Sequence, residues 1–432
     1  MDWIYSLDIL DGAFVGGAVA AGVAVLVVLV AARSDRWRVQ RLLLAAAAGT
    51  LVGLTFFVSW DAADALGLYL PEDVGRLLMA TCAAGGVAIA CLWDRQAWRR
   101  ALAAAGVLVI AVSGGAAVNA YFGYDRTLGA LAGVSTGPPI DLGALPQGAG
   151  PVKGAAAGKL LSAWTPPAGM PAVGRRGTVQ IPSNGFAARR AGVYLPPAAL
   201  TAHPVRLPLV VLMMGYPGTP DPGAVANVLD AFAAAHRGLA PIVVVADQIG
   251  TKGDPACADS TTYGPAESYI LDDVIPWARR TFSVLGDAAH TAIGGYSNGG
   301  ACAFKLAAER PALFGAMFSV SGEEYPGAES PQAAIADVFH GDVKAFDAAK
   351  PAAILARHHG RYSHITAVFT VGSGDPTFTP GVRRAEQAAK AAGMAASFRT
   401  VPGAGHVHGA IGGGFRTAFE VLLPVLGLGG QK

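Results

Sequence analysis

A serine lies between glycines at residues 295–299 (GYSNG), a segment that fits the pattern Gly-x-Ser-x-Gly. A β-like run, residues 291–295, precedes this segment, and an Ala-rich stretch of helical character, residues 301–309, follows it. In such a strand–turn–helix setting the serine is held on a sharp, strained turn with its hydroxyl exposed. Ser297 is therefore the candidate nucleophile. Without the strand before it and the helix after it, the same five residues would indicate only a glycine-rich turn.

A serine hydroxyl is a weak nucleophile until a base takes its proton, so the pattern calls for a histidine oriented by a carboxylate. In this strand–turn–helix arrangement the chain order is serine, acid, histidine. Asp375 follows a strand-like run in VGSGDP, and His406 follows the last such run in PGAGH. His408 is the rival base, but His406 comes directly after the glycine turn and is preferred. Ser297, Asp375 and His406 are the predicted catalytic residues.

Acyl transfer also needs hydrogen-bond donors for the oxyanion of the tetrahedral intermediate. The usual donors are the amide after the nucleophile and an amide from the loop after an early strand. Asn298 supplies the first amide. The second candidate is the amide of Tyr216, in the segment LMMGYPG that ends a buried apolar run.

Elements that would position these residues alternate after Gly174. Continuous apolar runs indicate strands buried on both faces, and Ala-rich stretches between them indicate helices. The predicted strands are 177–182, 190–195, 207–214, 241–246, 291–295, 316–321, 365–372 and 398–401. The predicted helices are 224–236, 267–282, 301–309 and 415–423, with Pro424 ending the last. Residues 174–432 are thus predicted to form an α/β-hydrolase domain with a mostly parallel central sheet flanked by helices, opened by an antiparallel pair.

The amino-terminal part of the chain has a different composition. Charged residues make up 14% of the 432 residues, against about 25% in typical soluble domains. The shortfall is concentrated in four apolar runs, 13–32, 42–60, 77–93 and 101–118, each long enough or nearly so to cross a bilayer. A buried soluble bundle would show apolar stripes, whereas these runs are apolar on all faces. We expect a four-helix transmembrane domain at residues 1–119 and a Gly/Ala/Pro-rich linker at 120–173.

Arginines between the runs predict the orientation, because basic loops stay on the cytoplasmic side. They lie after the first and third runs: Arg33, Arg36, Arg38 and Arg41, then Arg95, Arg99 and Arg100. The amino-terminal segment and the second loop are mainly acidic. We therefore expect a multi-pass plasma-membrane protein with both termini and the catalytic domain outside. The runs contain no Asp, Glu, Lys, Arg or His, which favours an anchor over a transporter.

Several segments together resemble a known family: MGYPG, CADSTTYGPAESYILDDVIPWARRTF, GGYSNGG, SVSGEEYP, GSGDP and GAGH. They are similar to the esterase D and mycolyltransferase (antigen 85) branch of α/β-hydrolases, in an actinobacterial membrane-anchored form. The resemblance covers residues 174–430 and implies the same nucleophile, acid and base. The acid is an aspartate where the mycolyltransferases use a glutamate, which argues against mycolyl transfer. Met214 is another departure, since many relatives have His or Asp there.

The resemblance and the predicted location imply a membrane-anchored serine ester hydrolase acting on lipid or envelope esters. Similar proteins include hydrolases of aminoacyl lipids such as alanyl-phosphatidylglycerol. The ammonium group of such a substrate would need carboxylates near Ser297. The candidates are Asp259, Glu267, Glu323 and Glu324. Their alternatives are a helix start for Glu267, where a negative charge favours the helix dipole, and solvated surface positions for Glu323 and Glu324.

Two other functions stay open at this stage. One is an acyltransferase of the mycolyltransferase type, in which an alcohol instead of water resolves the acyl-enzyme. The other is a catalytically silent hydrolase-like domain that binds envelope components. A net charge of +2 without basic runs excludes nucleic acid as a partner. His358, His359 and His364 lack carboxylates at ligand spacing, so neither a metal nor another cofactor is expected.

Cys257 and Cys302 are the cysteines outside the apolar runs. In an oxidising exterior they are predicted to form a disulfide between a loop and the helix after Ser297. The alternative for Cys302 is a free, buried core thiol on that helix.

Overall fold

The computed structural model describes residues 2–5, 7–31, 36–62, 70, 72–122, 127–131, 138–145, 160–216, 218–407 and 409–429. The chain divides into two compact units, Met1–Ala132 and Gly133–Lys432. The predicted linker spans this division, and much of it lies outside the described residues. Its described part after residue 137 packs on the second unit: the Thr178 amide donates to the Pro138 carbonyl, and Trp164 Nε1 donates to the Arg237 carbonyl.

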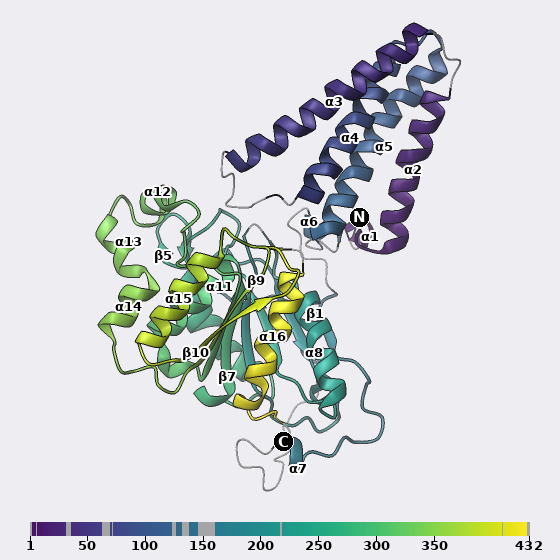
Figure 1. Cartoon of the computed structure of the whole chain (residues 1–432). Helices are drawn as coiled ribbons and strands as arrows, with labels where there is room; N and C mark the ends of the chain where they lie inside the picture. The colour runs from purple at the N-terminus through teal and green to yellow at the C-terminus, as the bar shows by residue number, and fades with distance from the viewer. Residues whose placement is uncertain are drawn as a thin grey trace. The chain divides into compact units, whose positions relative to one another are not determined.

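The first unit is built from four long helices that run side by side (Figure 1). They are α2 (Gly12–Val30), α3 (Arg36–Ala62), α4 (Glu72–Ala90, followed by a 3-10 turn, Cys91–Trp93) and α5 (Ala97–Phe122). All four are long and apolar enough to cross a membrane, and they coincide with the four predicted runs. Two short helices, α1 (Asp2–Tyr5) and α6 (Leu128–Leu131), lie near the ends of this unit.

Contacts near the helix ends show in which direction consecutive helices of this bundle run. Asp94 forms ion pairs with Arg38 (3.4 Å) and Arg99 (3.6 Å), so the start of α3 and the start of α5 meet at the loop after α4. The Leu128 amide donates to the Leu7 carbonyl over 3.1 Å, so the chain enters and leaves the bundle together. Consecutive long helices therefore run in opposite directions along the bundle.

The second unit contains an eight-stranded sheet in the order β1-β2-β4-β3-β7-β8-β9-β10. Its strands are β1 (Arg175–Val179), β2 (Ala191–Leu195), β3 (Leu209–Met213), β4 (Ile242–Ala246), β7 (Thr291–Tyr296), β8 (Ala316–Val320), β9 (Thr366–Gly372) and β10 (Ala395–Val401). The pairs β1–β2 and β2–β4 are antiparallel, and all other neighbours are parallel. All eight predicted strands are present, and the parallel ones deliver their carboxyl ends to one edge.

Helices cover both faces of this sheet (Figure 1). One face carries α11 (Asn298–Glu309), α14 (Pro351–Arg357) and α15 (Thr379–Ala391), and the other carries α8 (Gly223–Ala235) and α16 (Ala410–Val425). Aromatic rings fill both layers: Phe304 packs edge-on against Phe369 under α11, and Phe318 packs against Phe415 and Phe419 of α16.

Some predicted helices differ from the observed ones. The helix predicted at 267–282 consists of α9 (Ala266–Ser268), a π-helical turn (Tyr269–Val274) and α10 (Ile275–Thr281). The last helix begins at Ala410 instead of residue 415, because the glycines of its first turns allow a close approach to the sheet: a Cβ on Gly414 would strike Val320. It also continues one residue past Pro424, where a proline in the last turn removes a single amide donor.

Four described helices between β8 and β10 were not predicted: α12 (Pro331–Ala333), α13 (Val343–Ala349), α14 and α15. β5 (Asp259–Ser260) and β6 (Gly264–Pro265) form a separate, short two-stranded sheet.

Candidate active site

Ser297 occupies a sharp turn between β7 and α11. Its φ of 52° lies in the left-handed region, which is strained for a residue with a side chain. The turn is possible because its flanks are glycines: a Cβ on Gly295 would strike the Gly299 carbonyl. The Ser297 amide donates to the Val320 carbonyl of β8 (2.9 Å), which ties the turn to the neighbouring strand. The predicted strand–turn–helix setting is therefore the observed one.

The structure brings Ser297, His406 and Asp375 into one hydrogen-bonded row. Ser297 Oγ lies 3.0 Å from His406 Nε2, and His406 Nδ1 lies 2.8 Å from Asp375 Oδ2. The three residues follow β7, β10 and β9, whose carboxyl ends share one edge of the sheet. Asp375 is only 3% exposed, so its carboxylate is largely shielded from water beside the imidazole.

Hydrogen bonds donated by backbone amides join the loops that carry the acid and the histidine. The Gly374 amide donates to the Ala404 carbonyl (2.8 Å), and the Gly403 amide donates to Ser373 Oγ (2.9 Å). The amide of Phe378 donates to Asp375 Oδ1 (3.1 Å), which leaves Oδ2 for His406. The separation of the two side chains is thereby set by the main chain.

Two aromatic rings enclose the imidazole of His406. Phe378 stacks on it with ring centroids 3.8 Å apart, and Tyr296 lies 5.5 Å away on centroids. Phe378 was not identifiable from the sequence, because nothing in its local pattern indicates contact with a residue in a different loop. The rival base, His408, lies outside the described residues.

The residues predicted to bind the oxyanion also lie near Ser297. Asn298 is the first residue of α11, where backbone amides have no acceptor within the helix and the helix dipole favours negative charge. A Cβ placed on Gly215 would lie 3.3 Å from Ser297 Cβ, so the loop that carries Tyr216 runs against the nucleophile. Tyr216 as a whole residue is 39% exposed.

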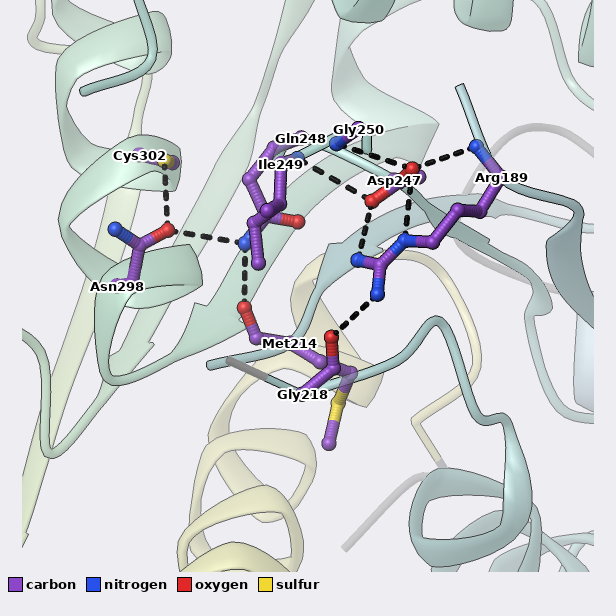
Figure 2. Close-up of polar contacts among 9 residues, drawn as sticks. All are labelled: Arg189, Met214, Gly218, Asp247, Gln248, Ile249, Gly250, Asn298 and Cys302. Carbon is purple, nitrogen blue, oxygen red and sulfur yellow. Dashed lines mark hydrogen bonds and ion pairs between the residues drawn. The ribbon is translucent and has the colours of Figure 1, made fainter. Parts of the chain in front are cut away.

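The Asn298 side chain is buried in a polar network that sequence reasoning missed. Its Nδ2 donates to Asp254 Oδ2 (2.9 Å), and its Oδ1 accepts from Gln248 Nε2 (3.0 Å; Figure 2 shows the Gln248 contact). Burial raises the pKa of Asp254, although hydrogen bonds from Ala256 and Asn298 oppose the shift. The available signal was position: Gln248 comes just after a strand, at the edge of the sheet where the other site residues gather.

Two of the predicted substrate-binding carboxylates are engaged in ion pairs. Glu267 Oε2 lies 2.5 Å from Nζ of Lys305, a buried lysine on α11. Burial raises the pKa of Glu267, and the lysine opposes that rise. Glu324 Oε2 lies 2.6 Å from Nη2 of Arg384 on α15. These positions give both carboxylates partners within the chain.

The other two carboxylates differ from each other. Asp259 accepts hydrogen bonds from the amide (3.0 Å) and hydroxyl (2.5 Å) of Ser268. Glu323 is 5% exposed and accepts from the Ala328 amide (3.0 Å). It lies beside the nucleophile turn, since a Cβ on Gly300 would come within 3.1 Å of Cα in the preceding residue, Gly322.

Burial raises the pKa of Glu323 well above its ordinary range, and the negative charges of Glu329 and Asp254 add to the rise. A carboxyl in such a place gains from a nearby cation. Glu267 and Glu324 are thus ion-paired and Asp259 is exposed, whereas Glu323 is buried with no ion pair among its described contacts.

A disulfide joins Cys257 to Cys302, with their Cα atoms 5.6 Å apart. Cys257 belongs to the loop that carries Asp254, and Cys302 lies in the second turn of α11. The crosslink therefore connects the loop that contacts Asn298 to the helix that begins beside Ser297.

Residues 187–425 match the family model described as "Putative esterase", which covers more than half of the chain. The chain belongs to this esterase family. Esterases of this kind are carboxylic-ester hydrolases. An uncharacterized protein of Corynebacterium glutamicum is 36% identical over 239 residues, which make up 53% of this chain and 56% of that protein. The esterase thus spans little more than half the length of that relative.

Solved structures similar to the esterase include an S-formylglutathione hydrolase from Agrobacterium tumefaciens and a ferulic acid esterase from Anaeromyces mucronatus. The first has a TM-score of 0.48 and 16% identity, covering 59% of this chain and 96% of the hydrolase. The second has a TM-score of 0.41 and 14% identity, covering 61% of this chain and 95% of that esterase. No substrate of the present chain follows from either.

Proposed function

We propose that the chain is a serine ester hydrolase with Ser297 as nucleophile, His406 as general base and Asp375 as orienting acid. The observation that carries this proposal is the row of hydrogen bonds from Ser297 Oγ to His406 (3.0 Å) and from His406 to Asp375 (2.8 Å). A hydroxyl, an imidazole and a buried carboxylate in this order are the parts that nucleophilic acyl transfer requires.

The reaction proceeds in two halves. Ser297 Oγ attacks the ester carbonyl while His406 Nε2 takes the hydroxyl proton, and the imidazolium then gives this proton to the leaving alcohol as the ester bond breaks. Water, deprotonated by the same nitrogen, attacks the acyl-enzyme and releases the carboxylic acid. Asp375 stabilises the imidazolium and keeps Nε2 directed at the serine.

The amides of Tyr216 and Asn298 are the proposed oxyanion donors. Both belong to elements next to Ser297, and the amide of Asn298 also has the positive end of α11 behind it. Donors arranged before the reaction begins stabilise the developing negative charge without having to reorient.

Hydrolysis of p-nitrophenyl acetate tests this proposal. We expect turnover by the purified chain in detergent, and loss of about 10⁴-fold or more in kcat for Ser297→Ala. Ser162→Ala, in the short helix α7 (Leu160–Ala163), serves as the control and should keep the activity of the unaltered chain. Equal turnover by the Ser297 variant would contradict the assignment.

We propose in addition that the esterase is anchored in the plasma membrane with its catalytic unit outside, and that it acts on lipid or envelope esters. Four helices of sufficient length and hydropathy support the anchor, and the arginines after α2 and α4 support the orientation. A site tethered beside a bilayer meets lipid esters at high local concentration.

Within that class, we propose aminoacyl esters as substrates, with Glu323 as the partner of their ammonium group. Its support is a buried carboxyl beside the nucleophile turn with a raised pKa, whereas Glu267 and Glu324 are ion-paired and Asp259 is exposed and bonded to Ser268. The p-nitrophenyl esters of alanine and of propionic acid differ in that one ammonium group.

We expect the chain to prefer the alanyl ester, and Glu323→Gln to lower the alanyl-to-propionyl ratio of kcat/KM by about tenfold. Glu324→Gln, at the neighbouring carboxylate paired with Arg384, is the matched control and should leave the ratio unchanged. An unchanged ratio in the Glu323 variant would remove the ammonium site and leave the ester hydrolase standing.

A further inference from the structure

The two proposed oxyanion donors come from different parts of the chain. Tyr216 belongs to the loop after β3, and Asn298 begins the helix after β7. Both amides must point at a single oxygen atom, so their separation has to be held by something other than their own strands. Donors of this kind act only when their positions are fixed to a fraction of an ångström.

Gln248 links the two elements. It follows β4, is 2% exposed, and its Nε2 donates to the Met214 carbonyl (2.5 Å) and to Asn298 Oδ1 (3.0 Å), as Figure 2 shows. A primary amide nitrogen carries two hydrogens, and this geometry uses both. Met214 is two residues before Tyr216, so one bond holds the loop after β3 and the other holds the start of α11.

The Asn298 end of this link has a defined orientation. Asp254 Oδ2 accepts from Asn298 Nδ2 over 2.9 Å, which directs Oδ1 toward Gln248. The disulfide between Cys257 and Cys302 restrains the loop that presents Asp254. The Asn298 side chain is thus held from two directions.

The residue before Gln248 restrains the far end of the same loop. Asp247 is fully buried and binds Arg189, with 2.6 Å from Oδ1 to Nη2 and 3.1 Å from Oδ2 to Nε. Arg189 Nη1 in turn donates to the Gly218 carbonyl (3.0 Å; Figure 2). Two adjacent residues after β4 therefore hold the loop after β3, directly at Met214 and through Arg189 at Gly218.

We infer that Gln248 is a positioning residue of the esterase, which sets the spacing of the oxyanion donors by bonding Met214 and Asn298 at once. The inference rests on the proposed function of Ser297, Tyr216 and Asn298. Gln248 does not touch the substrate, so its loss should weaken stabilisation of the tetrahedral intermediate and leave binding of the ground-state ester unchanged.

The test compares Gln248→Met with the unaltered chain. Methionine fills a similar volume but donates no hydrogen bond. We expect kcat for p-nitrophenyl acetate to fall about 10- to 100-fold with KM within about twofold. The affinity for an aryl trifluoromethyl ketone, which adds Ser297 and develops an oxyanion, should fall by a similar factor.

Tyr362→Phe is the matched control. Tyr362 is also fully buried, and its hydroxyl donates to the carbonyl of Ala308 (2.9 Å), near the other end of α11. It should lower the midpoint of thermal unfolding without changing kcat or ketone affinity. Gln248→Asn keeps the amide but is too short to reach both acceptors, and should give an intermediate loss if the methionine variant does not fold.

Outcomes for the inference and for the proposed function are distinct. If folded Gln248→Met or Gln248→Asn keeps kcat and ketone affinity within twofold of the unaltered chain, Gln248 is only structural and the inference is overturned. If Ser297→Ala still hydrolyses the ester and still binds the ketone, the proposed function fails, and the inference fails with it.

Discussion

The proposed role of Asp375, to orient His406, depends on one of its two carboxylate oxygens. Its Oδ2 faces His406 Nδ1 at 2.8 Å while its Oδ1 is occupied by the Phe378 amide. In Asp375→Asn, the amide can face His406 Nδ1 with either its NH2 group or its carbonyl oxygen. An NH2 group there favours the imidazole tautomer that is protonated on Nε2, which cannot accept the serine proton. A carbonyl oxygen there is a weaker acceptor than the carboxylate. We expect kcat to fall about 10³- to 10⁴-fold with little change in KM.

The control for that measurement is Asp347→Asn, at an exposed aspartate whose partner is Lys350. It should leave kcat unchanged. A folded Asp375→Asn variant with near-normal kcat would show that the carboxylate does not orient the histidine.

Glu323 makes a prediction about pH and stability. Its pKa in the folded chain is raised above the ordinary value of 4.5, so between these two values the folded state binds more protons than the unfolded state. Stability contributed by this group is therefore present at low pH and is lost as pH rises through the raised pKa. Glutamine cannot ionise, so Glu323→Gln avoids this loss of stability at high pH. We expect the substitution to raise the midpoint of thermal unfolding at pH 7.5.

That gain should shrink as the pH approaches 4.5, and Glu324→Gln, at a carboxylate paired with Arg384, should show no such gain at pH 7.5. If Glu323→Gln lowers the midpoint of thermal unfolding by the same amount at pH 7.5 and at pH 4.5, the pKa of the Glu323 carboxyl is not raised in the folded chain.

At this scale the sequence was informative where chemistry and local setting coincide. Ser297, Asp375 and His406 were identifiable because each follows a strand-like run in a glycine-rich turn, and the structure places them within hydrogen-bond distance. Gln248 and Phe378 were not identifiable, because their roles come from contacts across loops far apart in sequence. Partners such as Lys305 for Glu267 were hidden for the same reason.

At the scale of elements, the turn that holds Ser297 depends on its glycines. A Cβ on Gly295 would strike the Gly299 carbonyl, and backbone atoms cannot move aside as a flexible side chain would. We expect Gly295→Ala to lower the free energy of unfolding by about 3 kcal/mol and to reduce kcat with it. Urea unfolding measures the first quantity and ester hydrolysis the second. Gly286→Ala is the control and should change neither, because a Cβ at Gly286 has nothing within 4 Å.

The disulfide between Cys257 and Cys302 closes a segment with a sequence separation of 45. We expect Cys257→Ser with Cys302→Ser to lower the free energy of unfolding by about 2 to 4 kcal/mol. A reducing agent should lower the urea midpoint of the unaltered chain and leave that of the double variant unchanged. Cys82→Ser, at a free cysteine in α4, is the control. A midpoint insensitive to reduction would contradict the predicted contribution.

Strands were easier to predict than helix ends. Runs such as 207–214 and 241–246 are apolar because they are buried on both faces, so their residue types alone identify them as strands. The π-helical turn Tyr269–Val274 and the early start of α16 depend on how closely the backbone packs against neighbouring elements, which the apolar pattern along the chain does not reveal.

At the scale of the whole molecule, the proposed orientation predicts which side of the membrane the site faces. Arg38 of α3 and Arg99 of α5 meet at Asp94 at one end of the bundle, and Leu7 and Leu128 are hydrogen-bonded to each other where the chain enters and leaves it. A membrane-impermeant fluorophosphonate should therefore label Ser297 in intact cells to the same extent as in lysed cells. Labelling that appears only after lysis would place the catalytic unit inside.

The central claim is that Ser297 is the nucleophile of an ester hydrolase. The most direct measurement is mass spectrometry of the purified full chain after reaction with a fluorophosphonate, followed by peptide mapping. We predict one phosphonyl adduct, located on Ser297, with parallel loss of ester hydrolysis and no adduct in Ser297→Ala. An unmodified chain, or an adduct that persists in Ser297→Ala, would contradict the claim.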